Sequence, residues 1–365
     1  MSHFRLASLS LIAFLIWTSA SAALTPLPAG VENRYHLITE DTYLRDYDAK
    51  VLPEVRKLER AGEFPGVDGV PIRYRTYLLE RSKERGAVVI SSGRTESLLI
   101  YPEVIYDLTR QGYSVFIHDH RGQGLSGRLL RESQKGHVVH FDDYVTDLET
   151  FMKQVVQPHG QKNLFLLAHS MGGGIASLYL ERPGHDFKAA VLVTPMLEPL
   201  LGYKALTGTL CEASHTYLAK VVLGQRNYAT EQKPYKRLAF GDPANDLTHS
   251  NVRWEKTRDI YAANMTAAVG GATHGWVREA CSAAKSARAN AGKVEVPLLL
   301  LQATEDTAVK NDAQNSFCVG VNAGGHANCF GYAIQKAYHA VLFEADTFRI
   351  PAMTAILDFL RRNTN

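Results

Sequence analysis

The sequence predicts an α/β fold in which a mostly parallel central sheet is covered by helices on both faces. Two observations lead to this prediction. Short, unbroken apolar runs such as residues 164–168 and 298–301 are typical of strands that are buried on both sides. Along the chain these runs alternate with segments such as 141–156, whose apolar residues recur at helical spacing, and this alternation indicates parallel strands joined by helices.

The expected elements follow one another in a regular order. Residues 31–66 look polar and helical and end at the turn EFPG. Strands are expected at residues 70–80, 86–93, 114–120, 163–168, 189–194, 296–304 and 332–338. The remaining helices are expected at residues 97–110, 141–156, 172–181 and 350–362.

One stretch interrupts this succession. Residues 195 to about 290 contain no clear buried strand but many helix-like segments, so we expect a helical insertion between two core strands. The expected organisation is a signal peptide (1–22), an N-terminal helical extension (23–66), a core in two parts (67–195 and 291–365) and a helical lid insertion (196–290).

The N-terminus has the features of an export signal. His3 and Arg5 precede an apolar stretch, residues 9–17, and Ala20 and Ala22 then form the A-x-A pattern that precedes a cleavage site. An uncleaved membrane anchor is the alternative, but the apolar stretch is only about half of the roughly 20 residues that a spanning helix needs. We therefore expect cleavage after Ala22 and export to the periplasm or the medium. The exported protein could also be associated with the membrane.

The four cysteines agree with export. An even number of cysteines in an exported chain suggests disulfides, and four cysteines allow three pairings. Proximity in the sequence favours Cys318 with Cys329, which leaves Cys211 with Cys281. Buried free thiols are the alternative, and without a C-x-x-C pair the spacing does not resemble a zinc site.

Composition argues against a nucleic-acid partner. The 40 basic and 37 acidic side chains nearly cancel to a net charge of +3, and no dense Lys/Arg cluster is interleaved with aromatic residues. The hydrophobic fraction of 45% is ordinary for a packed globular protein.

A candidate nucleophile follows the apolar run at 164–168. Ser170 is flanked by Ala168 and Gly172 in the pattern small-x-Ser-x-small, and three glycines occupy positions 172–174. Small residues are needed where a strand turns so sharply into a helix that the serine hydroxyl is exposed. A helix-capping serine is the alternative, but it does not explain the glycines.

A serine hydroxyl becomes a good nucleophile beside a histidine base that is oriented by a carboxylate. In this type of fold the chain order is Ser, then Asp or Glu, then His. Glu305 and Asp306 follow the strand expected at 296–304, and His339 follows the last expected strand. Periodicity does not choose between the two adjacent acids, although each candidate lies at a strand end, where sites in such sheets gather.

The oxyanion of an acyl-transfer intermediate needs two N–H donors. One is expected from the main chain of Met171, the residue after the serine. The other is expected from Arg94, which follows Gly93 in the loop after the strand at 86–93. A different site is suggested by His118 and His120 flanking an aspartate, but no further nearby histidine completes a metal ligand set, so no metal is expected.

Six segments carry a resemblance to a known family: SSGRTES, DHRGQGLSGR, AHSMGGG, LTHSNVRW, GGATHGWVRE and YHAVLFEADTFR. They resemble the bacterial lysophospholipases of the monoacylglycerol-lipase group of α/β-hydrolases, from about residue 65 to the C-terminus. The resemblance implies an α/β-hydrolase core with a lid. It also implies the triad Ser170, Asp306 and His339, with Asp306 chosen as the final acid of LQATED, and no cofactor.

The same resemblance implies hydrolysis of the acyl ester of lysophospholipids or monoacylglycerols. Two departures bear on it: Ala168 replaces the glycine of many relatives, and Ser92-Gly93 replaces the His-Gly of monoacylglycerol lipases. A monoacylglycerol lipase, a broad carboxylesterase and a catalytically silent lipid- or partner-binding protein remain alternatives. The leucine-rich residues 196–210 would line an acyl channel, touch membrane lipid peripherally, or simply pack on the core.

Overall fold

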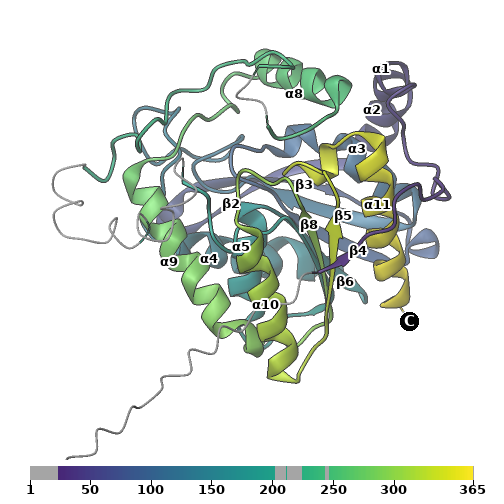
Figure 1. Ribbon diagram of the computed structural model, residues 1–365. Helices are drawn as coiled ribbons and strands as arrows, with labels where there is room; N and C mark the ends of the chain where they lie inside the picture. The colour runs from purple at the N-terminus through teal and green to yellow at the C-terminus, as the bar shows by residue number, and fades with distance from the viewer. Residues whose placement is uncertain (1–23, 202–210, 212–223, 243–245, 365) are drawn as a thin grey trace, which may run out of the picture.

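The computed structural model describes residues 24–201, 211, 224–242 and 246–364. At its centre these residues form a nine-stranded sheet (Figure 1). The strands are β1 (Thr25–Pro26), β2 (Glu59–Pro65), β3 (Pro71–Tyr77), β4 (Gly86–Ser91), β5 (Tyr113–His118), β6 (Leu164–His169), β7 (Phe187–Val193), β8 (Leu298–Ala303) and β9 (Cys329–Ile334). Their order across the sheet is β1-β9-β8-β7-β6-β4-β5-β3-β2. Only the β2–β3 and β3–β5 pairs are antiparallel, so the predicted mostly parallel sheet is confirmed.

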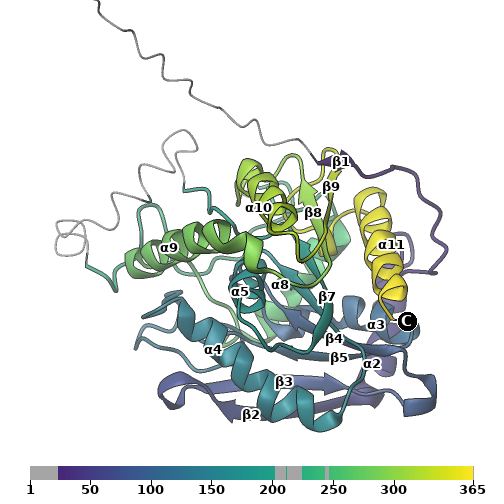
Figure 2. The same cartoon turned by 90° about the horizontal axis from the view of Figure 1, so that it is seen from below.

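Helices cover both faces of this sheet (Figure 2). The α-helices among the described residues are α1 (Tyr43–Asp46), α2 (Leu52–Leu58), α3 (Pro102–Arg110), α4 (Asp142–Phe151), α5 (Met171–Leu180), α8 (Asn251–Ala263), α9 (His274–Asn290), α10 (Asn311–Gly324) and α11 (Asp346–Arg362). Helices α4, α5, α9 and α10 pack into the core on one face, whereas α3, α11 and the N-terminal helices pack into the core on the other.

The strand β4 shows why the central runs are apolar without interruption. Successive side chains of a strand point to opposite faces. Ala87 and Val89 belong to the core on one face and Val88 and Ile90 to the core on the other, and each is at most 1% exposed. A strand that is covered on both faces has no position for a polar side chain pointing to water.

The prediction of a helical segment through residues 23–66 is partly wrong. Helices α1 and α2 are joined by a π-helical turn at Tyr47–Val51, but the following seven residues form the edge strand β2. In that strand only Phe64 is buried, so the apolar alternation that marks a strand is missing. Gly62 lets the strand lie against the ring of Tyr74, because a Cβ there would approach that ring to 2.3 Å.

Two further differences lie near the C-terminus. The last strand, expected at 332–338, is β9 and ends at Ile334, after which the chain turns with a φ of 65° at Lys336. Helix α10 was not expected, because its sequence NDAQNSFCVGVNAG is polar at its start and contains two glycines. It connects β8 to β9 and packs against both strands.

The expected signal peptide and most of the leucine-rich segment 196–210 lie outside the described residues. In the described part of the expected insertion, α8 and α9 are helical and the connecting segments are turns and loops. Within the described chain, no helix is both long enough and apolar enough to cross a membrane.

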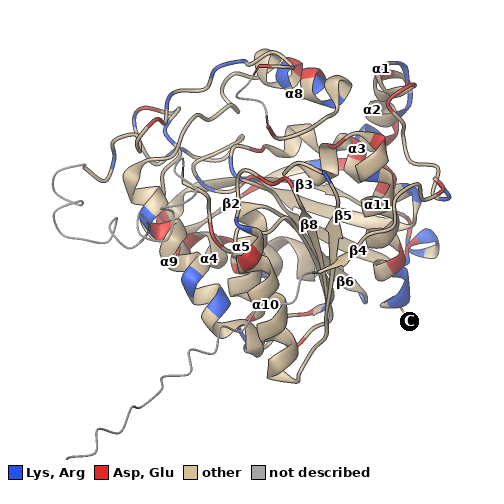
Figure 3. Ribbon diagram, viewed as in Figure 1, with Lys and Arg blue, Asp and Glu red and all other residues tan. Residues whose placement is uncertain are grey.

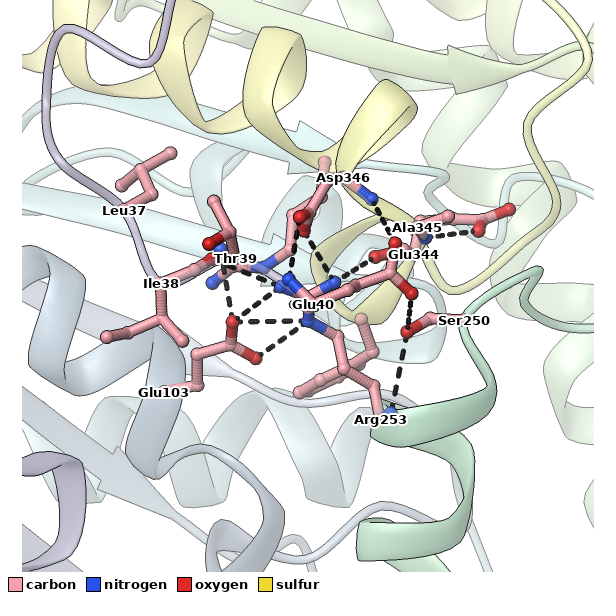
Figure 4. A network of polar contacts seen from close by, with 12 residues as sticks. Leu37, Ile38, Thr39, Glu40, Glu103, Ser250, Arg253, Glu344, Ala345 and Asp346 are labelled. Carbon is pink, nitrogen blue, oxygen red and sulfur yellow. Dashed lines mark hydrogen bonds and ion pairs between the residues drawn. The ribbon is translucent and has the colours of Figure 1, made fainter. Parts of the chain in front are cut away.

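A buried ionic network attaches α8 to the core (Figure 4). The Arg253 side chain is 1% exposed and forms ion pairs with Glu103 of α3 and Asp346 of α11, each at 2.9 Å. It also donates a hydrogen bond to the carbonyl oxygen of Ile38, and Ser250 donates one to Glu40. The network therefore ties the N-terminal segment, α3, α8 and α11 together.

Candidate active site

Ser170 occupies the turn between β6 and α5. Its backbone angles are φ 52° and ψ −118°, a conformation that costs a non-glycine residue free energy unless its surroundings hold it. They do so here, since the Ser170 N–H donates to Val193 and its carbonyl oxygen accepts from Gly173, Gly174 and Met196. The hydroxyl group is thereby presented at the carboxyl end of the sheet.

The three glycines have a definite steric role. A Cβ at Gly172 would approach the Ser91 carbonyl oxygen to 2.1 Å, and one at Gly173 would approach Pro195 to 2.6 Å. At Gly174 an added Cβ would lie 2.9 Å from the Met196 carbonyl oxygen, which is a looser but still crowded contact. Helix α5 can therefore start close against the ends of β4 and β7 only because these positions carry no side chain.

The structure brings Ser170, His339 and Asp306 together. The Nε2 atom of His339 lies 2.8 Å from the Ser170 hydroxyl oxygen, and its Nδ1 atom lies 2.7 Å from a carboxylate oxygen of Asp306. All three residues are at most 9% exposed. The contact is made by Asp306, whereas the N–H of the adjacent Glu305 donates to the Ala337 carbonyl oxygen.

His339 and Asp306 are each fixed by further hydrogen bonds. The second carboxylate oxygen of Asp306 accepts from the amides of Ala308 and Val309, at 2.8 and 3.0 Å. The carbonyl oxygen of His339 accepts from the Thr194 hydroxyl at 3.0 Å and from Nε2 of His169 at 3.2 Å. These bonds orient the imidazole toward the serine without using either of its ring nitrogens.

His169 and Glu96 form a buried pair beside this cluster, which the sequence did not predict. The His169 Nδ1 atom lies 2.8 Å from Glu96, whose carboxylate also accepts from the Tyr101 hydroxyl and the Gly93 amide. Burial alone would raise the pKa of Glu96, but His169 and these donors outweigh it and lower that pKa. Burial would lower the pKa of His169, but Glu96 outweighs it and raises that pKa. The segments SSGRTES and AHSMGGG, which contain Glu96 and His169, both belong to the family resemblance. Their spacing in the sequence, however, does not predict that these two side chains meet.

The loop that carries Arg94 is held by the segment with the two histidines. Asp119 accepts from the Leu98 amide and the Ser97 hydroxyl, and Gln123 donates to the Gly93 carbonyl oxygen. Burial raises the pKa of Asp119 to about 6. Within the described residues, no group of three His, Cys, Asp or Glu side chains is arranged to hold a metal ion.

The two expected oxyanion donors come from different segments, Met171 from the start of α5 and Arg94 from the loop after β4. Met171 is the first residue of α5, and the first amides of a helix have no acceptor within the helix. Arg94 lines the same cavity as Ser170 and His339. Those positions are compatible with the expected role.

A cavity of about 220 Å³ opens onto the serine. The loop with Arg94 and Glu96 lines this cavity, and so does α8, which contributes Arg253, Trp254 and Arg258. The sequence reasoning did not identify α8 as a wall of the site, although LTHSNVRW was among the segments of the resemblance.

The cysteine pairing favoured by the sequence is confirmed. Cys318 is joined to Cys329 and Cys211 to Cys281. The first bond ties α10 to β9, and the second ties α9 to residue 211 of the expected insertion. Disulfides of this kind persist in oxidising compartments.

The comparisons with known proteins cover most of the chain. A family model described as Hydrolase_4 (Serine aminopeptidase, S33) matches residues 82–346. The chain belongs to this family. It is a serine hydrolase of the α/β-hydrolase superfamily, and its similarity to lysophospholipases and other esterases shows that it is an ester hydrolase.

Two curated relatives of this α/β-hydrolase match over nearly their whole length. Lysophospholipase L2 of Escherichia coli K12 is 38% identical over 313 residues, which are 83% of this chain and 88% of that protein. Probable lysophospholipase L2 of Haemophilus influenzae is 31% identical over 81% of this chain and 90% of that protein. A crystal structure of a soluble variant of monoglyceride lipase from Saccharomyces cerevisiae has a TM-score of 0.65 at 18% identity, covers 84% of this chain and 96% of its own, and shares the fold.

Proposed function

We propose that this α/β-hydrolase is a lysophospholipase that uses Ser170, His339 and Asp306 as a catalytic triad. The observation that supports it most is the chain of two hydrogen bonds, 2.8 and 2.7 Å long, that runs from the serine through the histidine to the aspartate. The 38% identity to lysophospholipase L2 supports the substrate class.

In the proposed reaction, His339 takes the proton from the Ser170 hydroxyl as its oxygen attacks the ester carbonyl carbon. Asp306 stabilises the imidazolium that forms. His339 then gives the proton to the departing glycerol oxygen, which leaves an acyl-enzyme. The same histidine next takes a proton from water, the hydroxide attacks the acyl carbonyl, and the proton returns to Ser170 as the fatty acid is released.

The main-chain N–H groups of Met171 and Arg94 are proposed to bind the oxyanion. Each such donor in an oxyanion hole contributes about 3 kcal/mol to stabilising the transition state. The start of α5 at Met171 supports this role, because the positive end of a helix favours a developing negative charge.

Two wider features belong to the same proposal. Residues 196–290 are proposed to form a lid, with the leucine-rich part at 196–210 lining an acyl channel or contacting membrane lipid. Export through residues 1–22 is supported by the two disulfides.

A monoacylglycerol lipase or a broad carboxylesterase is the second candidate. A monoacylglycerol lipase of Mycolicibacterium smegmatis is 33% identical over 132 residues, 36% of this chain. This match supports the second candidate, but it covers a shorter part of the chain than the lysophospholipase matches do. Hydrolysis of lysophosphatidylcholine compared directly with that of monoolein separates the two.

The test of the catalytic assignment uses the purified mature chain. A fluorophosphonate probe should label the wild type and leave Ser170→Ala unlabelled, and the variant should lose turnover of a short-chain p-nitrophenyl ester by roughly 10⁶-fold. Ser177→Ala is the matched control, because Ser177 lies on α5 and donates only to the Gly173 carbonyl oxygen. Turnover of Ser170→Ala within tenfold of the wild type would rule the proposal out.

A further inference from the structure

The arginines that line the cavity differ in their partners. Arg253 is saturated by Glu103 and Asp346. Arg258, one and a half turns further along α8, forms no ion pair with any residue that the structure describes, and its Nε atom is buried without a hydrogen-bond partner there. Its guanidinium lies 3.9 Å from the centre of the Trp254 ring, which holds it beside the cavity.

The acids nearest to Arg258 in the sequence are engaged elsewhere. Glu255 and Asp259 both pair with Arg237, at 3.0 and 2.9 Å, so α8 carries residues of both signs (Figure 3). The acid that lines the cavity within the described chain, Glu96, is already bonded to His169, Tyr101 and Gly93. No carboxylate from these residues is therefore left for the Arg258 guanidinium.

Two more donors face the same cavity. Arg94 donates to the Gly270 carbonyl oxygen and lies over the Trp276 ring, and it too forms no ion pair with a described residue. The hydroxyl of Tyr235 is buried and has no partner among the described residues. A guanidinium carries five N–H donors, and a buried donor without an acceptor costs free energy. The cavity thus combines surplus donors and positive charge with the Ser170 hydroxyl.

We propose that Arg258, Arg94 and Tyr235 form a subsite for the phosphodiester group of the substrate, next to the ester that Ser170 attacks. This inference rests on the proposed function and deepens it, since it names the group that separates a lysophospholipid from a monoacylglycerol. In a lysophospholipid the phosphate is attached to the same three-carbon glycerol unit as the acyl ester. Arginine is the side chain best suited to bind phosphate oxygens in pairs.

The size of the cavity fits this assignment. Its volume of about 220 Å³ is below the roughly 300–1,000 Å³ of pockets that enclose a drug-sized ligand. The cavity is therefore too small to enclose a whole lysophospholipid, and the subsite is assigned only to the phosphate part of its head group.

The experiment compares lipids that share one acyl chain: lysophosphatidylcholine, lysophosphatidylethanolamine and 1-monoacylglycerol. In Arg258→Gln, the ratio of kcat/KM for each lysophospholipid to that for monoacylglycerol should fall about 10- to 100-fold, the range for losing a charged hydrogen bond. Both lysophospholipids should lose equally, because the phosphate is common to them. Tyr235→Phe, which removes one neutral donor and keeps the ring, should lower the ratio severalfold and remains informative if Arg258→Gln does not fold.

Arg237→Gln is the matched control, since its guanidinium faces Glu255 and Asp259 outside the cavity. A second readout is inhibition of p-nitrophenyl butyrate hydrolysis by sn-glycero-3-phosphocholine, whose inhibition constant should rise at least tenfold in Arg258→Gln. Ratios within threefold of the wild type in both variants, or a loss confined to one head group, would overturn the phosphate subsite. Failure of the wild type to hydrolyse any of the esters would instead refute the proposed function.

Discussion

The two walls of the cavity are built on different physical principles. The wall with Ser170 and His339, together with Asp306 behind His339, consists of turns at the ends of β6, β8 and beyond β9, and hydrogen bonds that involve the main chain hold each of these residues. The wall from α8 is held by side-chain ion pairs, above all those of Arg253 with Glu103 and Asp346. Main-chain hydrogen bonds fix the strand-end side, whereas α8 is held by buried side chains, among them the charged Arg253 and the aromatic Trp254 and Tyr261.

The groups proposed for catalysis and most of those proposed for substrate selection are therefore held in place by different parts of the structure. The groups proposed to act on the ester are fixed by hydrogen bonds that involve the backbone of the core. Of the groups proposed to select the substrate, Arg258 belongs to α8, Tyr235 to the segment before α8, and Arg94 to the loop after β4. Changes in the two walls should therefore affect different measurements.

The largest effect is expected in the strand-end wall. Asp306→Asn should lower kcat by about 10⁴-fold, because an amide in place of the carboxylate favours the wrong imidazole tautomer. The amides of Ala308 and Val309 still find an acceptor in the asparagine oxygen, so the midpoint of urea unfolding should change little. Glu305→Gln is the matched control. A comparable loss of kcat in that variant would show that Asp306 is not the acid of the triad.

A smaller effect, on stability, is expected in the α8 wall. Glu103→Gln removes the buried carboxylate shared by Arg253 and Arg349 and should lower the free energy of unfolding by about 3–5 kcal/mol. Glu255→Gln, which breaks the surface pair with Arg237, should cost less than about 1 kcal/mol. Equal losses of stability in urea unfolding would contradict the view that buried charges hold α8.

The smallest effect is expected at the His169–Glu96 pair beside the proposed triad residues, and it depends on pH. The lowered pKa of Glu96 stabilises the fold above about pH 4.3, and this contribution is lost as the pH falls through the lowered value. The raised pKa of His169 stabilises the fold below about pH 6.5, and this contribution is lost as the pH rises through the raised value.

Glu96→Gln should therefore destabilise the protein most between about pH 4.3 and 6.5, by about 1.5–3 kcal/mol, and less at higher pH. Unfolding midpoints measured across this range provide the test. Tyr101→Phe removes a neutral donor to the same carboxylate, so its destabilisation should not vary with pH in this window. A loss in Glu96→Gln that is constant from pH 5 to 9 would show that the pair is not ionised.

Much of the fold could be predicted because its signals are local. The apolar runs that became β4, β6 and β8 are buried on both faces, and the glycines after Ser170 mark a close approach of backbones. The edge strand β2 escaped prediction because it buries only Phe64, and α10 because its sequence begins with polar residues.

The candidate site divides along the same line. Ser170 and His339 could be selected from their positions after predicted strands, and their order along the chain pointed to a triad. Periodicity did not decide between Glu305 and Asp306, because adjacent side chains differ only in the direction that the folded loop imposes. The His169–Glu96 pair and the α8 wall could not be predicted, since they join residues 73 or more positions apart through charges that leave no periodic pattern. Short-range pattern thus specifies strands, turns and the candidate serine, whereas packing of distant segments settles which charges meet and which remain available to a ligand.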